Sequence, residues 1–173
     1  ALAPWLRVNG ALTEINLKAN SLGSPDWCAI FNALRDNKQN KIAEWDLRDQ
    51  GIGAEVTKAL GEYVAVSSVL TSLNLYDNQI GVEGGKAIGA ALHVNSVLTD
   101  LNLSGNPIGG YYNDDYELVC TPEGPAAIAD ALHVNGVLTS LDLAGNKLGD
   151  EGARAIGDAL HVNSVLTSLN LEY

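Results

Sequence analysis

A stretch of eight residues returns along this chain at regular intervals. The sequence VLTSLNLY begins at Val69, and close copies of it begin at Val97, Val137 and Val165. The first and third intervals are 28 residues, whereas the second is 40 residues because of an insertion. A period of this length is typical of a solenoid, in which each small unit is stabilised by packing on its neighbours. The sequence therefore predicts one stack of units in place of a single central core.

The first half of each unit predicts a short strand. Leu73 and Leu75 alternate with outward-facing residues, which is typical of a strand with one buried face. The segment 70–80 fits the leucine-rich repeat pattern L-x-x-L-x-L-x-x-N-x-L at every defined position. Strong copies and two weaker ones together predict six strand units, near residues 12–17, 42–47, 70–75, 98–103, 138–143 and 166–171.

The second half of each unit predicts a helix. Ala87, Ile88, Ala91 and Leu92 fall on one stripe of a helix, and small residues on that stripe allow close packing on the strands. Such a unit buries both of its faces only when neighbours stack on it. We therefore expect residues 1–173 to form a single α/β solenoid arc, with a parallel sheet on the concave side and helices on the convex side.

The repeat also carries a family resemblance. Its N-x-I-G turn, followed by an Ala-rich helix that ends in A-L-x-x-N, resembles the ribonuclease-inhibitor-like class of leucine-rich repeats. That class includes the repeat regions of NOD-like receptors and Ran GTPase-activating protein. The resemblance covers essentially the whole chain and implies a right-handed β/α arc. It implies a binding scaffold but specifies neither a partner nor a reaction.

One asparagine recurs where the chain leaves each strand. Its side-chain amide is expected to bond backbone groups that the turn leaves free, so its role is structural. Gln50 replaces it in the second unit. The expected asparagine ladder consists of Asn20, Asn78, Asn106 and Asn146.

The charge composition of the chain excludes some classes of binding partner and favours others. The net charge is −11 with a pI near 4.4, and no cluster of Lys and Arg is present to meet nucleic acid. A protein partner with a basic surface is favoured instead.

No apolar run approaches the roughly 20 residues that span a bilayer. Cys28 and Cys120 lie three units apart, so we expect free thiols. Together with the lack of a signal-peptide pattern they favour the cytoplasm, but the compartment stays open because the first residue is not Met.

The outward-facing strand residues define a candidate binding face. Acidic side chains outnumber basic ones there, and Tyr76, with Arg48 and Asp49 one strand away, is the best central anchor. A polar sheet face kept for solubility is the alternative interpretation. The candidates on this face are Glu44, Asp46, Arg48, Asp49, Tyr76, Asp77 and Asp100.

The insertion, about residues 110–121, has the composition of a contact loop. It reads GYYNDDYELVCT and holds half of the chain's six tyrosines, interleaved with acids. We expect a loop that protrudes from the rim without disturbing the stack; alternatively, its tyrosines fold back onto the concave face or shield a turn. A calcium site is disfavoured because the acids lack EF-hand spacing. The candidate contact residues are Tyr111, Tyr112, Asp114, Asp115, Tyr116 and Glu117.

No pattern in the sequence predicts catalysis, a metal or another cofactor. His93, His133 and His161 share one repeat position, which spaces them about 10 Å apart, too far to ligate one zinc at roughly 2 Å each. Their place at helix C-termini is favourable for the helix dipole. The serines are repeat positions or loop starts, so no nucleophile and base are expected together.

These patterns lead to a ranked set of functions. The first is a non-catalytic protein-recognition scaffold that binds through the concave face and the tyrosine-rich insertion. The second is a structural subunit of a larger assembly, because the chain starts inside a helix and stops in a strand turn, which predicts a piece of a longer array with covered ends. Regulation of a small GTPase is a minor third alternative.

Overall fold

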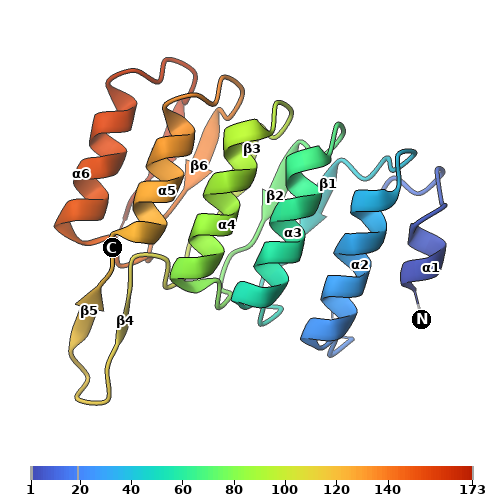
Figure 1. Cartoon of the computed structure of the whole chain (residues 1–173), viewed down its shortest axis with the longest axis horizontal. Coiled ribbons are helices and arrows are strands. Elements are labelled where there is room, and N and C mark those ends of the chain that lie inside the picture. The colour runs from blue at the N-terminus through green and yellow to red at the C-terminus, as the bar shows by residue number, and fades with distance from the viewer. Residues whose placement is uncertain (1, 19, 173) are drawn as a thin grey trace.

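The computed structural model describes residues 2–18 and 20–172 as one curved stack (Figure 1). Helices line one side of the arc and a parallel sheet lines the other. The α/β leucine-rich repeat solenoid expected from the sequence is thereby confirmed. The helices are α1 (Ala3–Leu6), α2 (Ser24–Asp36), α3 (Ala54–Val66), α4 (Gly81–Val94), α5 (Glu123–Leu132) and α6 (Gly149–Leu160). The strands are β1 (Glu44–Asp46), β2 (Ser72–Asn74), β3 (Asp100–Asn102), β4 (Gly110–Tyr112), β5 (Leu118–Cys120), β6 (Ser140–Asp142) and β7 (Ser168–Asn170).

The main sheet follows the order β1-β2-β3-β6-β7, and every neighbouring pair is parallel. Equivalent residues of successive units stand beside one another, so that Leu73 pairs with Leu101 and Leu101 pairs with Leu141. The repeat phase read from the sequence is therefore also the register of the sheet. The outward residues consequently form straight rows across the concave face.

The expected first strand differs from the structure. Residues 12–17 run without strand assignment, and the sheet of the described chain begins at β1. Ile15 and Leu17 still pack against the core. The pattern at Leu12 stands 30 residues before its equivalent at Ile42, two more than the usual 28. The 40-residue interval between Leu98 and Leu138 keeps the register of the sheet, so the spacing alone does not explain the missing ladder.

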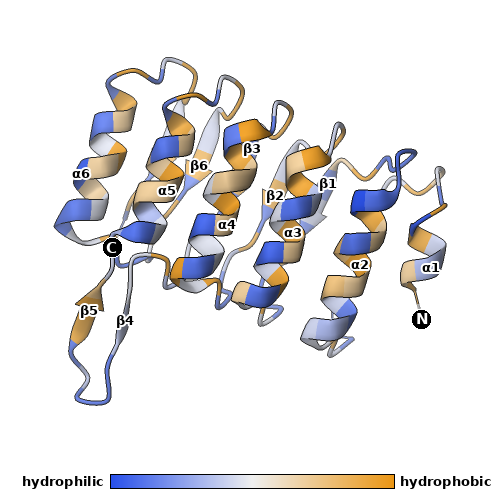
Figure 2. Ribbon diagram, in the orientation of Figure 1, coloured by the Kyte–Doolittle hydropathy of each residue, from blue (hydrophilic) through white to orange (hydrophobic). Residues whose placement is uncertain are grey.

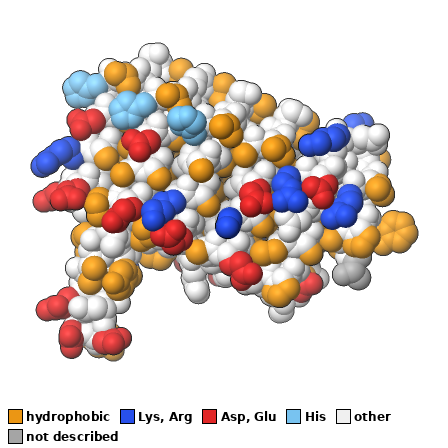
Figure 3. Space-filling view, in the orientation of Figure 1, with side chains coloured by type: hydrophobic (Ala, Val, Ile, Leu, Met, Phe, Trp, Pro, Cys, Tyr) orange, Lys and Arg blue, Asp and Glu red, His pale blue; other side chains and the backbone are white. Residues whose placement is uncertain are grey.

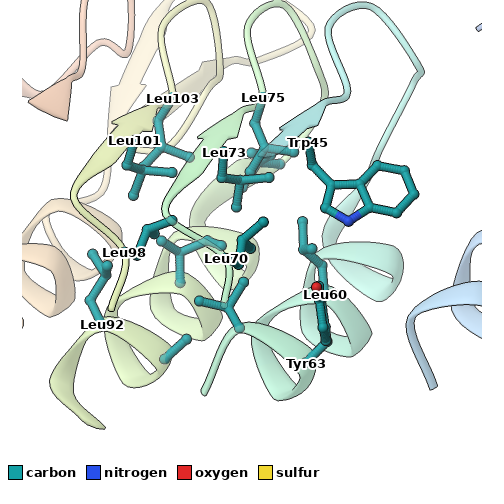
Figure 4. Close-up of a cluster of buried hydrophobic side chains, with 14 of the residues drawn as sticks. Trp45, Leu60, Tyr63, Leu70, Leu73, Leu75, Leu92, Leu98, Leu101 and Leu103 are labelled. Atoms are coloured by element: carbon teal, nitrogen blue, oxygen red, sulfur yellow. The ribbon is translucent and has the colours of Figure 1, made fainter. Parts of the chain in front are cut away.

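The core lies between the sheet and the helices. Inward strand leucines such as Leu73 and Leu101 meet helix residues such as Leu60 and Leu92, and all four are at most 1% exposed (Figure 4). Colouring by hydropathy shows apolar and polar residues alternating around the helices (Figure 2). At the tightest helix contact, a Cβ on Gly89 of α4 would lie 2.4 Å from the carbonyl oxygen of Ala127 in α5. Glycine at this position lets α4 and α5 approach closely.

The asparagines at the strand exits bridge neighbouring units. The Asn106 amide donates to the carbonyls of Leu75, Leu103 and Ser104, and its oxygen accepts from the N–H of Ile80. Asn78 and Asn146 make the corresponding donations, each reaching a carbonyl of the preceding unit. Asn20 is exposed, and its amide donates to the carbonyls of Leu17 and Lys18 in its own unit.

A second asparagine ladder, which the sequence pattern did not predict, lies where each helix ends. The amide of Asn95 donates to Val64 in the preceding unit, and its oxygen accepts from the N–H groups of Val97 and Leu98. The same arrangement recurs at Asn135 and Asn163. The A-L-x-x-N signature marks the helix end in the sequence, but it does not show that its asparagine bonds to the preceding unit.

The insertion is a β-hairpin and not an irregular loop. Strands β4 and β5 pair antiparallel, with Tyr111 opposite Val119 and Tyr112 opposite Leu118. The hairpin extends beyond the edge of the stack at the end where the helices begin (Figure 1). At its base, Thr121 N–H donates to the Gly109 carbonyl at 2.9 Å, and Gly109 N–H donates to the Asn146 carbonyl at 3.0 Å. These bonds close the insertion, so the next unit stacks in normal register.

No described helix is long and apolar enough to cross a bilayer.

Candidate functional site

The candidate residues of the concave face lie on or directly after the first three strands. The rows of the sheet place Glu44 beside Ser72, and Ser72 beside Asp100. Asp46 stands in the next row beside Asn74, which in turn stands beside Asn102. Arg48, Asp49, Tyr76 and Asp77 follow where β1 and β2 end. The structure therefore brings these residues together on one surface, which we call the concave group: Glu44, Asp46, Arg48, Asp49, Tyr76, Asp77 and Asp100.

Asp46 is the centre of the ion pairs of the concave group. Arg48 reaches it with two bonds of 2.8 Å, and the ammonium of Lys18 contacts the same carboxylate. The bonds from Arg48, followed by the bond from Lys18, hold the pKa of Asp46 well below its usual range. The same pairing raises the pKa of Arg48. Arg48 and Lys18 are thus engaged within the face, so the group presents a net acidic surface.

Tyr76 is the aromatic side chain of the concave group, and it is 46% exposed. A Cβ on Gly105 would lie 3.6 Å from the Tyr76 ring, so the ring lies over a position that carries no side chain. Its neighbours Asp49 and Asp77 adopt left-handed backbone angles, with φ of 54° and 52°. Their N–H groups donate to Tyr76 and Ser104 of the next unit, each at 3.0 Å. The acids beside Tyr76 are therefore fixed by the repeat turn.

Part of the outward face serves the fold and is not free for binding. The side-chain oxygens of Asn74, Asn102 and Asp142 each accept the N–H two residues further on, at 2.9 to 3.0 Å. Asp46 makes the same bond to Arg48 at 3.4 Å. This row is a series of local turn caps, which leaves the rows of Glu44 and Tyr76 as the more available surface.

The turn of the hairpin is held by Asn113. Its N–H donates to the Glu117 carbonyl at 3.0 Å, while its side-chain oxygen accepts from Asp115 and Glu117. These bonds occupy the amide oxygen that a calcium ion would need, and no metal-binding cluster occurs among the described residues. The loop 114–116 closes with Tyr116 at φ 60°.

Tyr116 is the most unusual residue of the hairpin. It is 89% exposed, and it occupies a left-handed conformation that glycine or asparagine normally takes at this turn position. For a bulky side chain this conformation costs about 1–2 kcal/mol. Tyr111 and Tyr112 are each 52% exposed. The alternative in which the tyrosines fold back to shield a turn applies in part to Tyr112, whose ring lies 4.2 Å from the Lys147 ammonium.

The hairpin and the concave group are two separate surfaces. The base of the hairpin bonds to Asn146, and Tyr112 of the hairpin contacts Lys147. The hairpin therefore packs against the unit that follows it and not against Tyr76. The space-filling view from the helix side shows the acids gathered at the hairpin tip (Figure 3). The histidines appear in a row near the opposite edge of the convex face. His133 and His161 bond with Nδ1 to helix carbonyls four residues earlier.

The two cysteines are free, as expected. Burial, reinforced by the charge of Glu55, raises the pKa of the Cys28 thiol, which therefore stays protonated and is a poor nucleophile.

Comparisons with known proteins support the geometry. Three segments, residues 66–89, 94–110 and 134–157, match the family described as Leucine Rich repeat. No curated protein matches the sequence. Among solved structures, leiomodin-1 actin-binding site 2 is 22% identical with a TM-score of 0.66, and the match covers 93% of this chain and 86% of that one. The C-terminal domain of tropomodulin from Caenorhabditis elegans is 16% identical with a TM-score of 0.70, covering 93% and 90%.

The repeat geometry and these matches agree on the fold. Three segments of the chain match the leucine-rich repeat family, and the chain folds as a leucine-rich repeat solenoid whose units pair one strand with one helix.

Proposed function

We propose that this chain is a non-catalytic protein-recognition scaffold. Its partner binds the hairpin through Tyr111, Tyr112 and Tyr116, and the concave group around Tyr76 provides a second contact area. A regular array supplies a rigid support, and the hairpin is the feature that departs from the array. The partner is a protein with a basic surface, because the exposed acids of both areas stand beside tyrosines.

The conformation of Tyr116 carries this proposal. A tyrosine at φ 60° is strained, and 89% exposure means that no packing within the chain compensates for the strain. Glycine would remove the strain at no loss of contact in the free protein. A tyrosine at this position is explained when its ring is buried by a partner, since tyrosine is enriched among residues that dominate binding energy.

Charge supports a basic partner. The net charge of the chain is −11, and the acids nearest to Tyr116 in the sequence are Asp114, Asp115 and Glu117. Complementary charge increases the association rate and excludes acidic competitors. Binding is therefore expected to weaken as the ionic strength rises.

Actin is the first named partner to test. The leiomodin-1 domain with the same fold is an actin-binding site, and the fold similarity alone motivates the choice. Cosedimentation with filamentous actin and a direct titration with monomeric actin test it. Absence of binding in both assays excludes actin and leaves the scaffold proposal to the capture experiment below.

The scaffold proposal is tested by affinity capture with quantitative mass spectrometry. A variant with Tyr111, Tyr112 and Tyr116 replaced by serine is compared with the native chain. The control replaces Val94, Val134 and Val162, which are 61%, 59% and 62% exposed on the other side of the molecule. We expect the tyrosine variant to lose proteins that the control retains, with unchanged circular dichroism. Identical capture by the native chain and both variants would remove the hairpin from the proposed function.

A further inference from the structure

The hairpin has an open backbone edge as well as exposed rings. The bonds Asn113 N–H to Glu117 and Thr121 N–H to Gly109 mark the hydrogen-bonded pairs at its two ends. Such pairs alternate with non-hydrogen-bonded pairs along an antiparallel ladder. Tyr112 and Leu118, which lie opposite one another, are therefore a non-hydrogen-bonded pair. Their N–H and C=O groups point away from the hairpin, toward its two outer edges.

The two edges have different surroundings. Strand β4 begins at the buried Gly110 and contacts α4, whereas all three residues of β5 are exposed or half-buried. Figure 1 shows β5 on the side of the hairpin away from α4. The outer edge of β5 is therefore the edge at which another strand can pair.

Two adjoining hollows lie along the same strand. One of about 300 Å³ is lined by Leu118, Leu148 and Leu171, and the other, of about 440 Å³, is lined by Cys120, Pro122 and Leu148. Because Leu118 and Cys120 share one face of β5, both hollows open beside that face. Alternate side chains of a strand paired with β5 would point toward these hollows.

The rims of the hollows are mainly acidic. Asp150 lines both hollows, Glu151 lines the larger one and Glu172 lines the smaller one. The basic side chain on these rims is Lys147, whose ammonium lies over the Tyr112 ring. Apolar lining with acidic rims fits a strand in which apolar and basic residues alternate.

We propose that the outer edge of β5 binds an extended protein segment of alternating apolar and basic residues by β-augmentation. Main-chain hydrogen bonds to Leu118 and Cys120 provide affinity, and the hollows with their acidic rims select the side chains. This inference rests on the proposed function, since it assigns the partner class and the binding mode of the same hairpin.

The edge is tested with a matched pair of proline variants. Leu118→Pro removes an outward N–H of β5, and Tyr112→Pro removes the corresponding N–H of β4. Neither substitution removes a bond within the hairpin, because both residues belong to the non-hydrogen-bonded pair. Leu118→Ala separates loss of the side chain from loss of the N–H. Amide chemical shifts of Tyr111 and Val119 report whether each variant keeps the hairpin.

The probe is a short synthetic peptide in which Lys and Val alternate, titrated by fluorescence anisotropy. Each proline variant is compared with a variant that loses the same side chain but keeps the N–H. Leu118→Pro should bind about tenfold more weakly than Leu118→Ala, whereas Tyr112→Pro should bind as tightly as Tyr112→Ser. Two peptide analogues, N-methylated at every Lys or at every Val, keep the same charge. We expect unequal affinities for the analogues, because one set of N–H groups faces β5. A peptide alternating Glu and Val should not bind.

The proposal that the partner pairs with β5 would be overturned if the two proline variants lost equal affinity relative to Leu118→Ala and Tyr112→Ser, or if the two methylated peptides bound equally. If the tyrosine variant still loses its captured partner under that outcome, the scaffold function stands and the binding mode is wrong. In the converse outcome, the peptide titration shows the expected difference between the proline variants, but the tyrosine variant captures the same proteins as the native chain. Pairing along β5 is then supported, and the proposed role of the tyrosine rings is wrong.

Discussion

Replacing Asn106 with alanine should weaken the array more than any comparable polar substitution on its surface. The side chain is 1% exposed, and its two amide hydrogens are shared among the carbonyls of Leu75, Leu103 and Ser104. Its oxygen also accepts the N–H of Ile80. Alanine removes both amide N–H donors and the oxygen that accepts the Ile80 N–H, in a site closed to water. At about 1 kcal/mol for each, the free energy of unfolding should fall by about 3 kcal/mol.

Asn20→Ala is the matched control. Asn20 makes two of the same bonds, but it is exposed and its acceptors lie within its own unit. Water replaces the lost amide there, so the expected change is below about 1 kcal/mol. The same residue type at the same repeat position therefore separates burial and bridging between units from asparagine identity.

Urea unfolding followed by circular dichroism and tryptophan fluorescence measures both variants. Asn106→Ala should shift the midpoint by roughly 1 M, and Asn20→Ala by much less. Trp27 and Trp45 report the N-terminal units, whereas circular dichroism reports the whole chain. If the two signals separate in Asn106→Ala, the substitution has uncoupled neighbouring units. Equal midpoints for the two variants would refute the bridging role.

Three further predictions follow from single positions. Tyr116→Gly should relieve about 1 kcal/mol of backbone strain and therefore slow amide hydrogen exchange at Val119. The same substitution should abolish partner capture. An unchanged exchange rate would contradict the proposed strain. Gly89→Ala should cost about 2–3 kcal/mol in chemical unfolding, because its Cβ would meet the Ala127 carbonyl, whereas Gly157→Ala, which has open space, should stabilise by roughly 0.5–1 kcal/mol. Arg48 and Lys18 lower the pKa of Asp46, so this carboxylate stabilises the fold above about pH 4 and loses that effect as the pH falls further. The stability difference between the native chain and Asp46→Asn should therefore shrink on acidification; a difference independent of pH would exclude the ion pairs.

The repeat made most of the fold predictable. Leu73 and its equivalents alternate with polar residues in every unit, and a shared phase in sequence becomes a shared register in the sheet. The strand predicted at residues 12–17 is not formed, although its apolar residues follow the same pattern as in the other units. A pattern for single strands does not report whether the neighbouring strand is in register to receive its hydrogen bonds.

The hairpin was harder to predict than the array. Its position and its exposed tyrosines followed from the composition of the insertion, but its strands did not. Hairpins are recognised from turn residues such as Asn-Gly, which adopt left-handed angles at little cost. Here Tyr116 takes that angle, so the local sequence contradicts the local structure. The stabilising bonds of Asn113 are side-chain contacts that become visible only when the turn is formed.

The array and the hairpin should respond independently to substitution. The Asn106 bonds cross from unit to unit, whereas the hairpin is closed at its base by Thr121 and Gly109 before the next unit starts. A change at Tyr116 therefore leaves the ladder intact, and a change at Asn106 leaves the hairpin bonds in place. Partner binding that follows the hairpin variants but not a mild ladder variant would place recognition in the insertion, with the repeats acting as its rigid support.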